Sequence, residues 1–390
     1  MSCYISSNNE RAYVALESTY GTVPAITSAN RIPLLKLTAK QVLEQTTRKD
    51  KTGSRTFVGL PNTIRKTTSF EIDTLMTEWT NQSAAPAQGP LFQAAMGGTP
   101  LSFGGGTVAA VTETTGIQFA APHALSVGQA ITYLGEMRFV AAVENSTTVF
   151  LNAAFNNIPT AGAAIGTTIT FVLSESLTGV SIFDYWDPSA AVQRILDGAA
   201  MNTMTVRVNG DYQEFDFAGP ARDLIDSASF TAGQGSLETF PAEPSQTGFD
   251  YTIVPGHLGE VWLGTSPTEF FTLTAAQLTL DNGVDLRVKE FGGDYAQCIA
   301  VGPRSVKLNF ELFELADAQT PALYQAARSR TPISVMLQLG EQATQLFGAY
   351  MPAMVPEVPE YDDSQTRLEW KFTNCRAQGT AENELYVAFG

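Results

Sequence analysis

The sequence predicts a mainly β protein that contains two copies of one β unit, each with a short helix, and a small β domain inserted into the first copy. Three observations support this class. Two distant segments are alike, several segments alternate apolar with polar residues, and the stretch 101–172 differs from the rest in composition. With 390 residues, of which 44% are hydrophobic, the chain can fill two or three packed domains.

The repeat is clearest in two ten-residue segments. Residues 91–100 read LFQAAMGGTP, residues 323–332 read LYQAARSRTP, and six of the ten positions are identical. Two upstream matches follow in the same order, because 38–42 aligns with 274–278 and 66–72 aligns with 306–312. Two copies are too few for a solenoid, and a duplicated unit usually serves a pseudo-symmetric assembly.

Period-two alternation predicts the strands. Residues 65–76, 204–217 and 366–373 each place apolar side chains opposite polar ones, with a turn in the second segment at Gly210–Asp211. This pattern is typical of strands with one buried face.

Helical signals are short. Pro90 and Pro321 each precede one of the repeated apolar segments, and proline is favoured at a helix start because its missing N–H is not needed there. We therefore expect one short helix in each copy, and a third over 189–197.

The stretch 101–172 has only three acidic residues and one basic residue, and it is rich in Ala, Thr and Gly. Short apolar runs recur in it at intervals of about ten residues, which favours a small barrel or sandwich. We therefore expect the first unit over 1–100 and 173–250, the insert over 101–172 and the second unit over 251–390.

The charge and cysteine content exclude several function classes. A net charge of −16 argues against binding to bare nucleic acid or to an anionic membrane surface. The three cysteines show neither metal-site nor disulfide spacing, which fits a reducing compartment. No basic–apolar secretory signal and no apolar run of about 18 residues is visible, so no membrane association is expected.

Catalytic signals are weak. The chain has two histidines, His123 and His257, both in turn-like contexts, and no phosphate-binding or metal-binding motif. We expect no enzyme activity, no cofactor and no metal. A carbohydrate-binding β protein is an alternative, because tryptophans can stack on sugars; the candidates are Trp79, Trp186, Trp262 and Trp370.

Two sets of charged residues are candidates for assembly contacts. The first is a basic loop within 46–56, and its interpretation stays open between a solvated loop and a hairpin that docks on another subunit. The second is an acidic segment that could match the loop electrostatically. The basic residues are Arg48, Lys49, Lys51 and Arg55, and the acidic residues are Glu357, Glu360, Asp362 and Asp363.

Acidic residues also recur on the polar side of the predicted strands. They are Glu71, Asp73, Glu214, Asp216, Glu311 and Glu369. Such a face is either an ordinary solvent-exposed surface or the wall of an acidic channel, and like charge would keep a DNA backbone from sticking to it.

Several segments resemble the tail tube proteins (major tail proteins) of long-tailed bacteriophages. They are ALESTYGTVPA at 15–25, RIPLLKLTAKQVLEQ at 31–45, KTGSR at 51–55 and NELYVAFG at 383–390. The duplication resembles the doubled tube proteins of T5-like and Chi-like siphophages. The resemblance implies two tandem β-sandwich or barrel domains, each with a flanking helix, and a trimer that forms a pseudo-hexameric ring.

The same resemblance implies a structural virion protein. Rings would stack, through the loops near 46–56 and 281–297, into a tail tube that conducts double-stranded DNA through an acidic lumen during ejection into the host. Implied partners are other copies of the chain, the tape measure protein and the tail tip and terminator proteins. Assembly would take place in the cytoplasm of the bacterial host.

Two points stay open beside this interpretation. A tail-tip or hub (distal tail) trimer, which would not stack on itself, is the main alternative. The insert is interpreted as an outward-facing decoration, and deletion of 101–172 is then expected to leave tubes intact.

Overall fold

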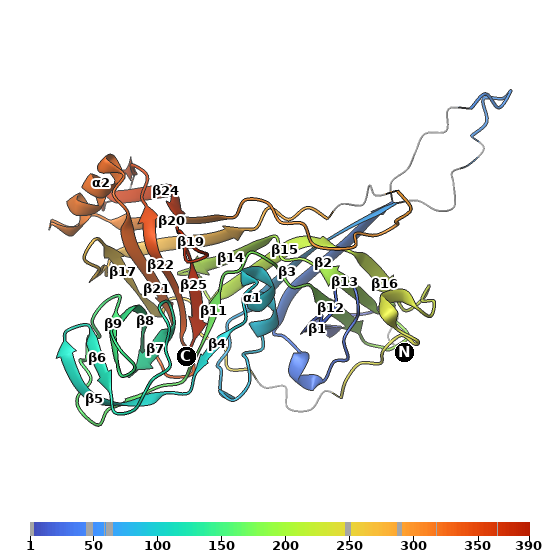
Figure 1. Cartoon of the computed structure of the whole chain (residues 1–390). Coiled ribbons are helices and arrows are strands. Elements are labelled where there is room, and N and C mark those ends of the chain that lie inside the picture. The colour runs from blue at the N-terminus through green and yellow to red at the C-terminus, as the bar shows by residue number, and fades with distance from the viewer. Residues whose placement is uncertain are drawn as a thin grey trace.

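The computed structural model describes residues 4–43, 50–57, 59, 65–245, 251–286, 291–316, 318–364 and 366–390. The predicted fold class is confirmed, because these residues form 25 β-strands and two α-helices (Figure 1). A single-turn 3-10 helix, Ser7–Asn9, precedes the first strand, and two more, Ser28–Asn30 and Gln234–Ser236, lie in connections.

The first copy consists of two sheets. One has the order β1-β12-β13-β16 and the other contributes β2-β3-β15-β14 to the large sheet. The strands are β1 (Glu10–Leu16), β2 (Leu34–Leu43), β3 (Lys66–Leu75), β12 (Val180–Trp186), β13 (Arg194–Ala199), β14 (Thr203–Val208), β15 (Glu214–Ala221) and β16 (Asp223–Asp226).

The second copy repeats these pairings. Its strands β17-β21-β22 pair as β1-β12-β13 do, and β19-β20-β24-β23 pair as β2-β3-β15-β14 do. The strands are β17 (Gly259–Gly264), β18 (Thr268–Glu269), β19 (Leu273–Asp281), β20 (Ser305–Phe313), β21 (Ile333–Leu339), β22 (Phe347–Val355), β23 (Glu360–Asp362), β24 (Glu369–Ala377) and β25 (Tyr386–Phe389).

The two copies are joined edge to edge. Strand β14, at the edge of the first copy, pairs antiparallel with β19, at the edge of the second. Eight strands thus lie in the continuous order β2-β3-β15-β14-β19-β20-β24-β23 within a 15-stranded sheet. We call these eight strands the joint sheet.

Pairing corrects one part of the sequence alignment. Ala39 lies opposite Phe70, and Ala276 lies opposite Phe310, so Ala39 and Ala276 are the equivalent residues. The alignment of 38–42 with 274–278 places Ala39 against Ala275, which is one position out. A slip of one residue in a strand exchanges its two faces. The alanine that lies opposite phenylalanine in each copy therefore fixes the correct alignment.

The two predicted short helices are present as α1 (Gly89–Met96) and α2 (Gln319–Ser329). In α1, Phe92 is fully buried at the centre of the main core. Five phenylalanine rings lie within 5.0–5.8 Å of its ring centroid, and they come from both copies and from β11: Phe171, Phe215, Phe217, Phe347 and Phe389. The copies therefore share one core.

The third predicted helix, over 189–197, is wrong. Residues from Arg194 onward form β13, which pairs with β12 on one side and β16 on the other. Helix propensity is a weak preference, and the buried position of Ile195 and Leu196 between two strands overrides it.

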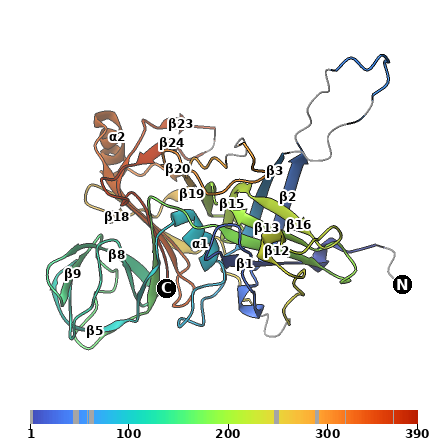
Figure 2. The same cartoon turned by 45° about the vertical axis from the view of Figure 1, so that its right-hand side comes forward.

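The insert is a small sheet of six strands in the order β10-β5-β6-β9-β8-β7. An isolated bridge between Thr132 and Gly166 brings the two ends of this sheet together, so it is nearly closed. Figures 1 and 2 show it as a separate lobe beside the second copy. Its strands are β5 (Gly106–Glu113), β6 (Gly116–Phe119), β7 (Ala130–Tyr133), β8 (Glu136–Val143), β9 (Thr148–Leu151) and β10 (Ala164–Ile165).

The strands that flank the insert belong to the large sheet. β4 (Leu101–Phe103) pairs with β11 (Thr168–Val172), and β11 pairs with the C-terminal β25. The stretch 101–172 is therefore anchored in the second copy by main-chain pairing as well as by side chains.

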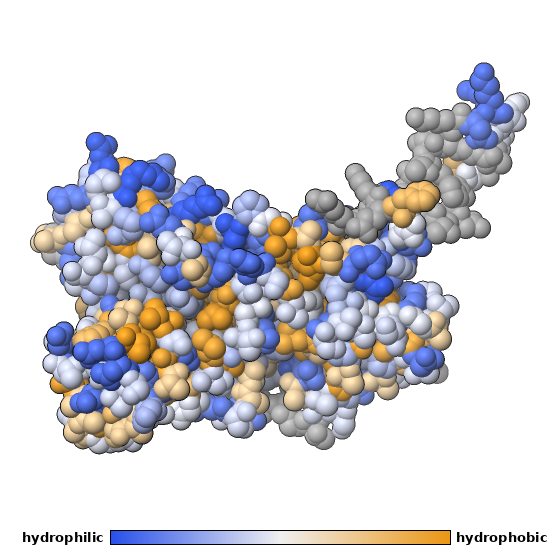
Figure 3. All heavy atoms as spheres, in the orientation of Figure 1, coloured by the Kyte–Doolittle hydropathy of each residue, from blue (hydrophilic) through white to orange (hydrophobic). Residues whose placement is uncertain are grey.

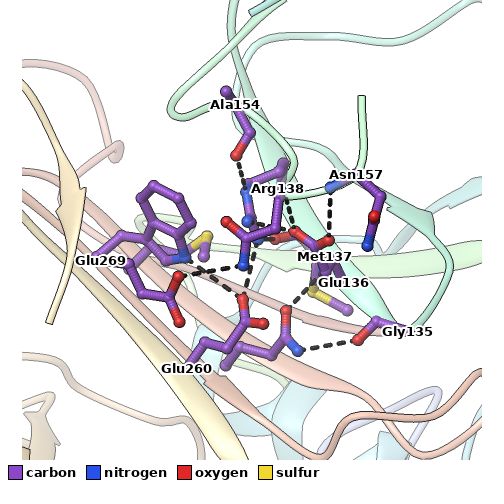
Figure 4. A network of polar contacts seen from close by, with 12 residues as sticks. Gly135, Glu136, Met137, Arg138, Ala154, Asn157, Glu260 and Glu269 are labelled. Carbon is purple, nitrogen blue, oxygen red and sulfur yellow. Dashed lines mark hydrogen bonds and ion pairs between the residues drawn. The ribbon is translucent and has the colours of Figure 1, made fainter. Parts of the chain in front are cut away.

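A buried polar network fixes the insert to the second copy (Figure 4). Arg138 of β8 is fully buried, forms an ion pair with Glu136 at 2.6 Å and lies 3.6 Å from a carboxylate oxygen of Glu260 on β17. Its guanidinium carbon lies 4.4 Å from the ring centroid of Trp262. Gln338 of β21 accepts a hydrogen bond from Met137 N–H and donates one to the carbonyl of Gly135.

Apolar contacts surround this network. Met137 and Phe139 of the insert pack with Met336, Tyr350 and Tyr386 of the second copy in one buried cluster. A Cβ added at Gly348 would lie 2.4 Å from the sulfur of Met137, so the two surfaces approach closely. This interface argues against the expectation that deletion of 101–172 leaves tubes intact, because removal of the insert would expose the cluster to water.

Candidate assembly surfaces

The joint sheet has one buried face and one exposed face. Phe70, Ile72, Phe310 and Leu312 lie in the core, whereas the alternating residues point away from it. All six acidic channel candidates lie on the exposed side of the joint sheet, as the alternation predicts.

Basic residues accompany these acids. Lys36 pairs with Glu71 at 3.0 Å, and Arg207 pairs with Asp216 and lies 4.0 Å from Glu214. Lys371 lies 3.9 Å from Glu311 and 3.8 Å from Glu369. The face is therefore of mixed charge. Its basic residues also follow the period of two, so the same alternation could have identified them.

Cross-strand register brings the acids close together at one place. Asp73 lies directly opposite Asp216, with Lys36 on the other side of Asp73. Burial raises the pKa of Asp216 to about 6; Arg207 lowers it and the neighbouring Asp73 raises it further. Burial likewise raises the pKa of Asp73. Part of this face is thus poised to take up protons in mildly acidic solution.

The basic loop is described in part. Arg48 and Lys49 lie outside the described residues, whereas Lys51 and Arg55 are exposed. The described segment 50–57 lies far from the body of the chain in both views (Figures 1 and 2). In the sequence this segment follows the edge strand β2, and its position away from the body suits contact with another molecule.

The acidic segment lies at the opposite end of the joint sheet. Glu360 and Asp362 are in β23, Asp363 follows it and is exposed, and Glu357 is 3.3 Å from Arg330. A hydrogen bond from Lys371 lowers the pKa of Asp362, and the two side chains are 2.7 Å apart. Within one chain the described residues 50–57 of the basic loop lie away from this segment (Figure 2).

The two ends of the joint sheet are unpaired edges. Among the described strands, β2 pairs only with β3 and β23 pairs only with β24. Unpaired strand edges are templates for pairing with another chain. Leu43 on β2 is 47% exposed and Tyr361 on β23 is 59% exposed.

The joined edges inside the chain show what such a contact would look like. Leu43 lies opposite Lys66, as Leu280 lies opposite Val306, and Tyr361 lies opposite Trp370, as Met204 lies opposite Phe217. Leu280 and Met204 are therefore the counterparts of Leu43 and Tyr361. They pair directly across the β14–β19 junction, and both are fully buried. Sequence reasoning did not identify Leu43 and Tyr361, because the signal requires the strand pairing.

Other kinds of site are weakly represented in the described part of the chain. It contains no helix long and apolar enough to cross a membrane and no group of three or more potential metal ligands. One hollow in the second copy is lined by three arginines, Arg304, Arg330 and Arg376. On the face shown in Figure 3, hydrophilic residues gather over α2 and β24, and apolar residues form separate patches nearer the centre.

Comparison with known proteins adds no identification. No family model matches the chain, and no curated protein matches its sequence.

Proposed function

We propose that this protein is a structural subunit that polymerises through its sheet edges, and that the polymer is a phage tail tube. In this proposal three chains close into a pseudo-hexameric ring, and rings stack into a tube that conducts double-stranded DNA during ejection. The polymer would form in the cytoplasm of the bacterial host and become part of the virion tail. It would meet the tape measure, tail tip and terminator proteins.

The observation that carries the proposal is the equivalence between the joined and the free edges. Strands β14 and β19 join the two copies, and their counterparts are β23 and β2. If β23 of one chain pairs with β2 of the next in the same register, Tyr361 lies opposite Leu43. Two half-exposed apolar side chains would then be buried, as Met204 and Leu280 already are.

In the proposed tube, the exposed face of the joint sheet would form the channel wall. It is polar along its length and carries paired charges of both signs. Paired acids and bases present no cluster of free cations to a phosphate backbone, so DNA could pass without being trapped.

The alternatives are supported less well. Three of the four candidate tryptophans, Trp79, Trp262 and Trp370, are at most 8% exposed, so their ring faces are not available to stack on a sugar; Trp186 is half-buried. A hub trimer would use the same edges, and it differs from a tube subunit only in failing to stack. Electron microscopy of the concentrated protein separates the two, because only a tube subunit gives long hollow tubes.

A disulfide experiment tests the edge pairing and the ring size together. Residues directly opposite in an antiparallel pair are close enough for a disulfide at suitable positions. We expect the double variant Leu43→Cys and Tyr361→Cys, made with Cys3→Ser and Cys298→Ser, to give covalent trimers on oxidation. The trimer should be the largest major species on a non-reducing gel, because a closed ring has no free ends.

Two controls make this result decisive. The Leu43→Cys variant alone has no partner cysteine on β23 and should stay monomeric or form sparse dimers. An open ladder of dimers, trimers, tetramers and larger species would contradict a closed three-chain ring. Absence of any crosslink under conditions in which the protein assembles would contradict the edge pairing itself.

A further inference from the structure

The long loop of the second copy folds back on the first copy of the same chain. It leads from β19 to β20, and its Tyr295 ring lies 5.6 Å from the Lys66 ammonium and 5.1 Å from the Arg222 guanidinium. Lys66 and Asp223, whose charged atoms lie 3.5 Å apart, both act on the Tyr295 hydroxyl: burial and the Asp223 carboxylate raise the pKa of this hydroxyl, and Lys66 lowers it. Lys66, Arg222 and Asp223 thus form a receptor for an aromatic side chain, which we call the tyrosine site.

The second copy has a counterpart of this site. Thr68 pairs with Ala221, and its counterpart Leu308 pairs with Cys375, so Arg222 and Asp223, which follow Ala221, correspond to Arg376 and Ala377. Lys66 corresponds to Val306, because Leu43 and Leu280 lie opposite them.

All three counterparts line one cavity. Val306, Arg376 and Ala377 lie in the wall of a hollow of about 500 Å³ that also includes Arg304 and Arg330. Arg304 is held by Glu382 and Glu384, and Arg330 by Glu357. The position that Tyr295 fills on the first copy is therefore a cavity on the second, and we call it the arginine cavity.

The chain offers one matching aromatic residue. Tyr295 lies 15 residues after Leu280, and Phe57 lies 14 residues after Leu43, the counterpart of Leu280. Tyr295 precedes Val306 by 11 residues, and Phe57 precedes Lys66, the counterpart of Val306, by 9. Phe57 is 73% exposed, in the segment that lies far from the body.

The chemistry of each site matches its aromatic residue. Lys66 and Asp223 place two charged groups that act on the tyrosine hydroxyl, whereas their counterparts Val306 and Ala377 are apolar. Phenylalanine has no hydroxyl to satisfy, and its ring can stack on the guanidinium of Arg376 as Tyr295 does on Arg222.

We propose that Phe57 of one chain inserts into the arginine cavity of the adjacent chain's second copy, as Tyr295 occupies the tyrosine site within the chain. This rests on the proposed edge-to-edge assembly, in which β2 of one chain adjoins the second copy of the next. The basic loop then links neighbours around a ring. The family resemblance implies that this loop also stacks one ring on the next. In the proposal, residues of the loop other than Phe57 make that contact.

A photo-crosslinking experiment tests this contact. A benzophenone amino acid at position 57 is irradiated in assemblies made from equal amounts of isotope-labelled and unlabelled chains. We expect mixed-label crosslinks to peptides that contain Val306, Arg376 or Ala377. Crosslinks of position 57 only to other surfaces, in assemblies that form normally, would overturn the inference and leave the proposed function intact. Failure of the parent chain to assemble at all would overturn both.

Substitutions give a second, independent test. Phe57→Ala should raise the concentration needed for assembly about ten-fold, since a buried aromatic contact is lost. Phe291→Ala, which removes a fully exposed aromatic from the other loop, should change this concentration little. Ala377→Asp should impair assembly, and Phe57→Tyr should restore it in that background, because the tyrosine hydroxyl can donate a hydrogen bond to the new carboxylate. No effect of Phe57→Ala, or no rescue, would count against the proposal.

Discussion

Phe92 and Tyr324 hold the same place in the two short helices, yet they are embedded differently. Phe92 is fully buried among five phenylalanines, whereas Tyr324 is partly exposed and its ring lies 5.4 Å from that of Trp370. We expect Phe92→Ala to lower the free energy of unfolding by about 3–5 kcal/mol, and Tyr324→Ala to lower it by clearly less. Urea denaturation of both variants measures the difference. Equal losses would show that the helices contribute alike to the core.

Arg138 should be essential for the stability of the insert interface. Its removal leaves Glu136 and Glu260 in a buried site without their cation, a change that typically costs about 3–5 kcal/mol. Arg138→Ala is therefore expected to shift the denaturation midpoint strongly. The exposed Arg328→Ala should change the stability by no more than about 0.5 kcal/mol. A small effect of Arg138→Ala would mean that water replaces the guanidinium.

Deletion of the insert should impair folding rather than remove a decoration. Replacement of 101–172 by a short Gly-Ser linker would expose Trp262, Tyr350 and Tyr386 and would unpair one edge of β25. We expect low soluble yield and binding of a hydrophobic dye. A deletion of 106–165 alone, which keeps β4 and β11, should be less severe. A soluble, cooperatively unfolding product of the larger deletion would contradict this expectation.

Asp216 should make stability depend on pH. Burial raises the pKa of Asp216 to about 6 in the folded chain, against roughly 4 for an unfolded aspartate. The folded state then binds the proton more tightly, so this group destabilises the fold above about pH 6, and the destabilisation fades as the pH falls toward 4. Asp216→Asn should raise the free energy of unfolding by about 1 kcal/mol at pH 7.5, after allowance for solvent screening, and should leave it unchanged near pH 4. If the explanation is wrong, unfolding curves of the variant and the parent chain will differ by the same free energy at every pH in this range.

Much of the fold could be read from local patterns. The alternation in 65–76 and 366–373 predicts β3 and β24, and the repeated LFQAA and LYQAA segments predict α1 and α2. Local sequence patterns do not predict the structure where pairing with neighbouring strands determines it. The segment 189–197 reads as a helix, but β12 and β16 on either side make its second half a strand. The one-residue error at Ala39 has the same origin, since only the opposing phenylalanine reveals the register.

The candidate sites show the same division. The acids on the exposed face were identifiable, because a period of two assigns them to one side of each strand. Their pairing with Lys36, Arg207 and Lys371 required the cross-strand register. Tyr361, Leu43 and Phe57 have no local signal at all, and they gain meaning only when the two copies are compared position by position.

The β14–β19 junction has a genetic consequence. In a ring of identical single-unit chains, every substitution appears at all six positions, so no contact can change without its symmetry mates. In this protein two neighbouring units belong to one chain. A codon change therefore alters only three of the six units in the proposed ring. The two units of such a chain can therefore diverge. The tyrosine site has Lys66 and Asp223, where the arginine cavity has Val306 and Ala377. Such a chain can also carry an extra domain on every second unit, as this one does.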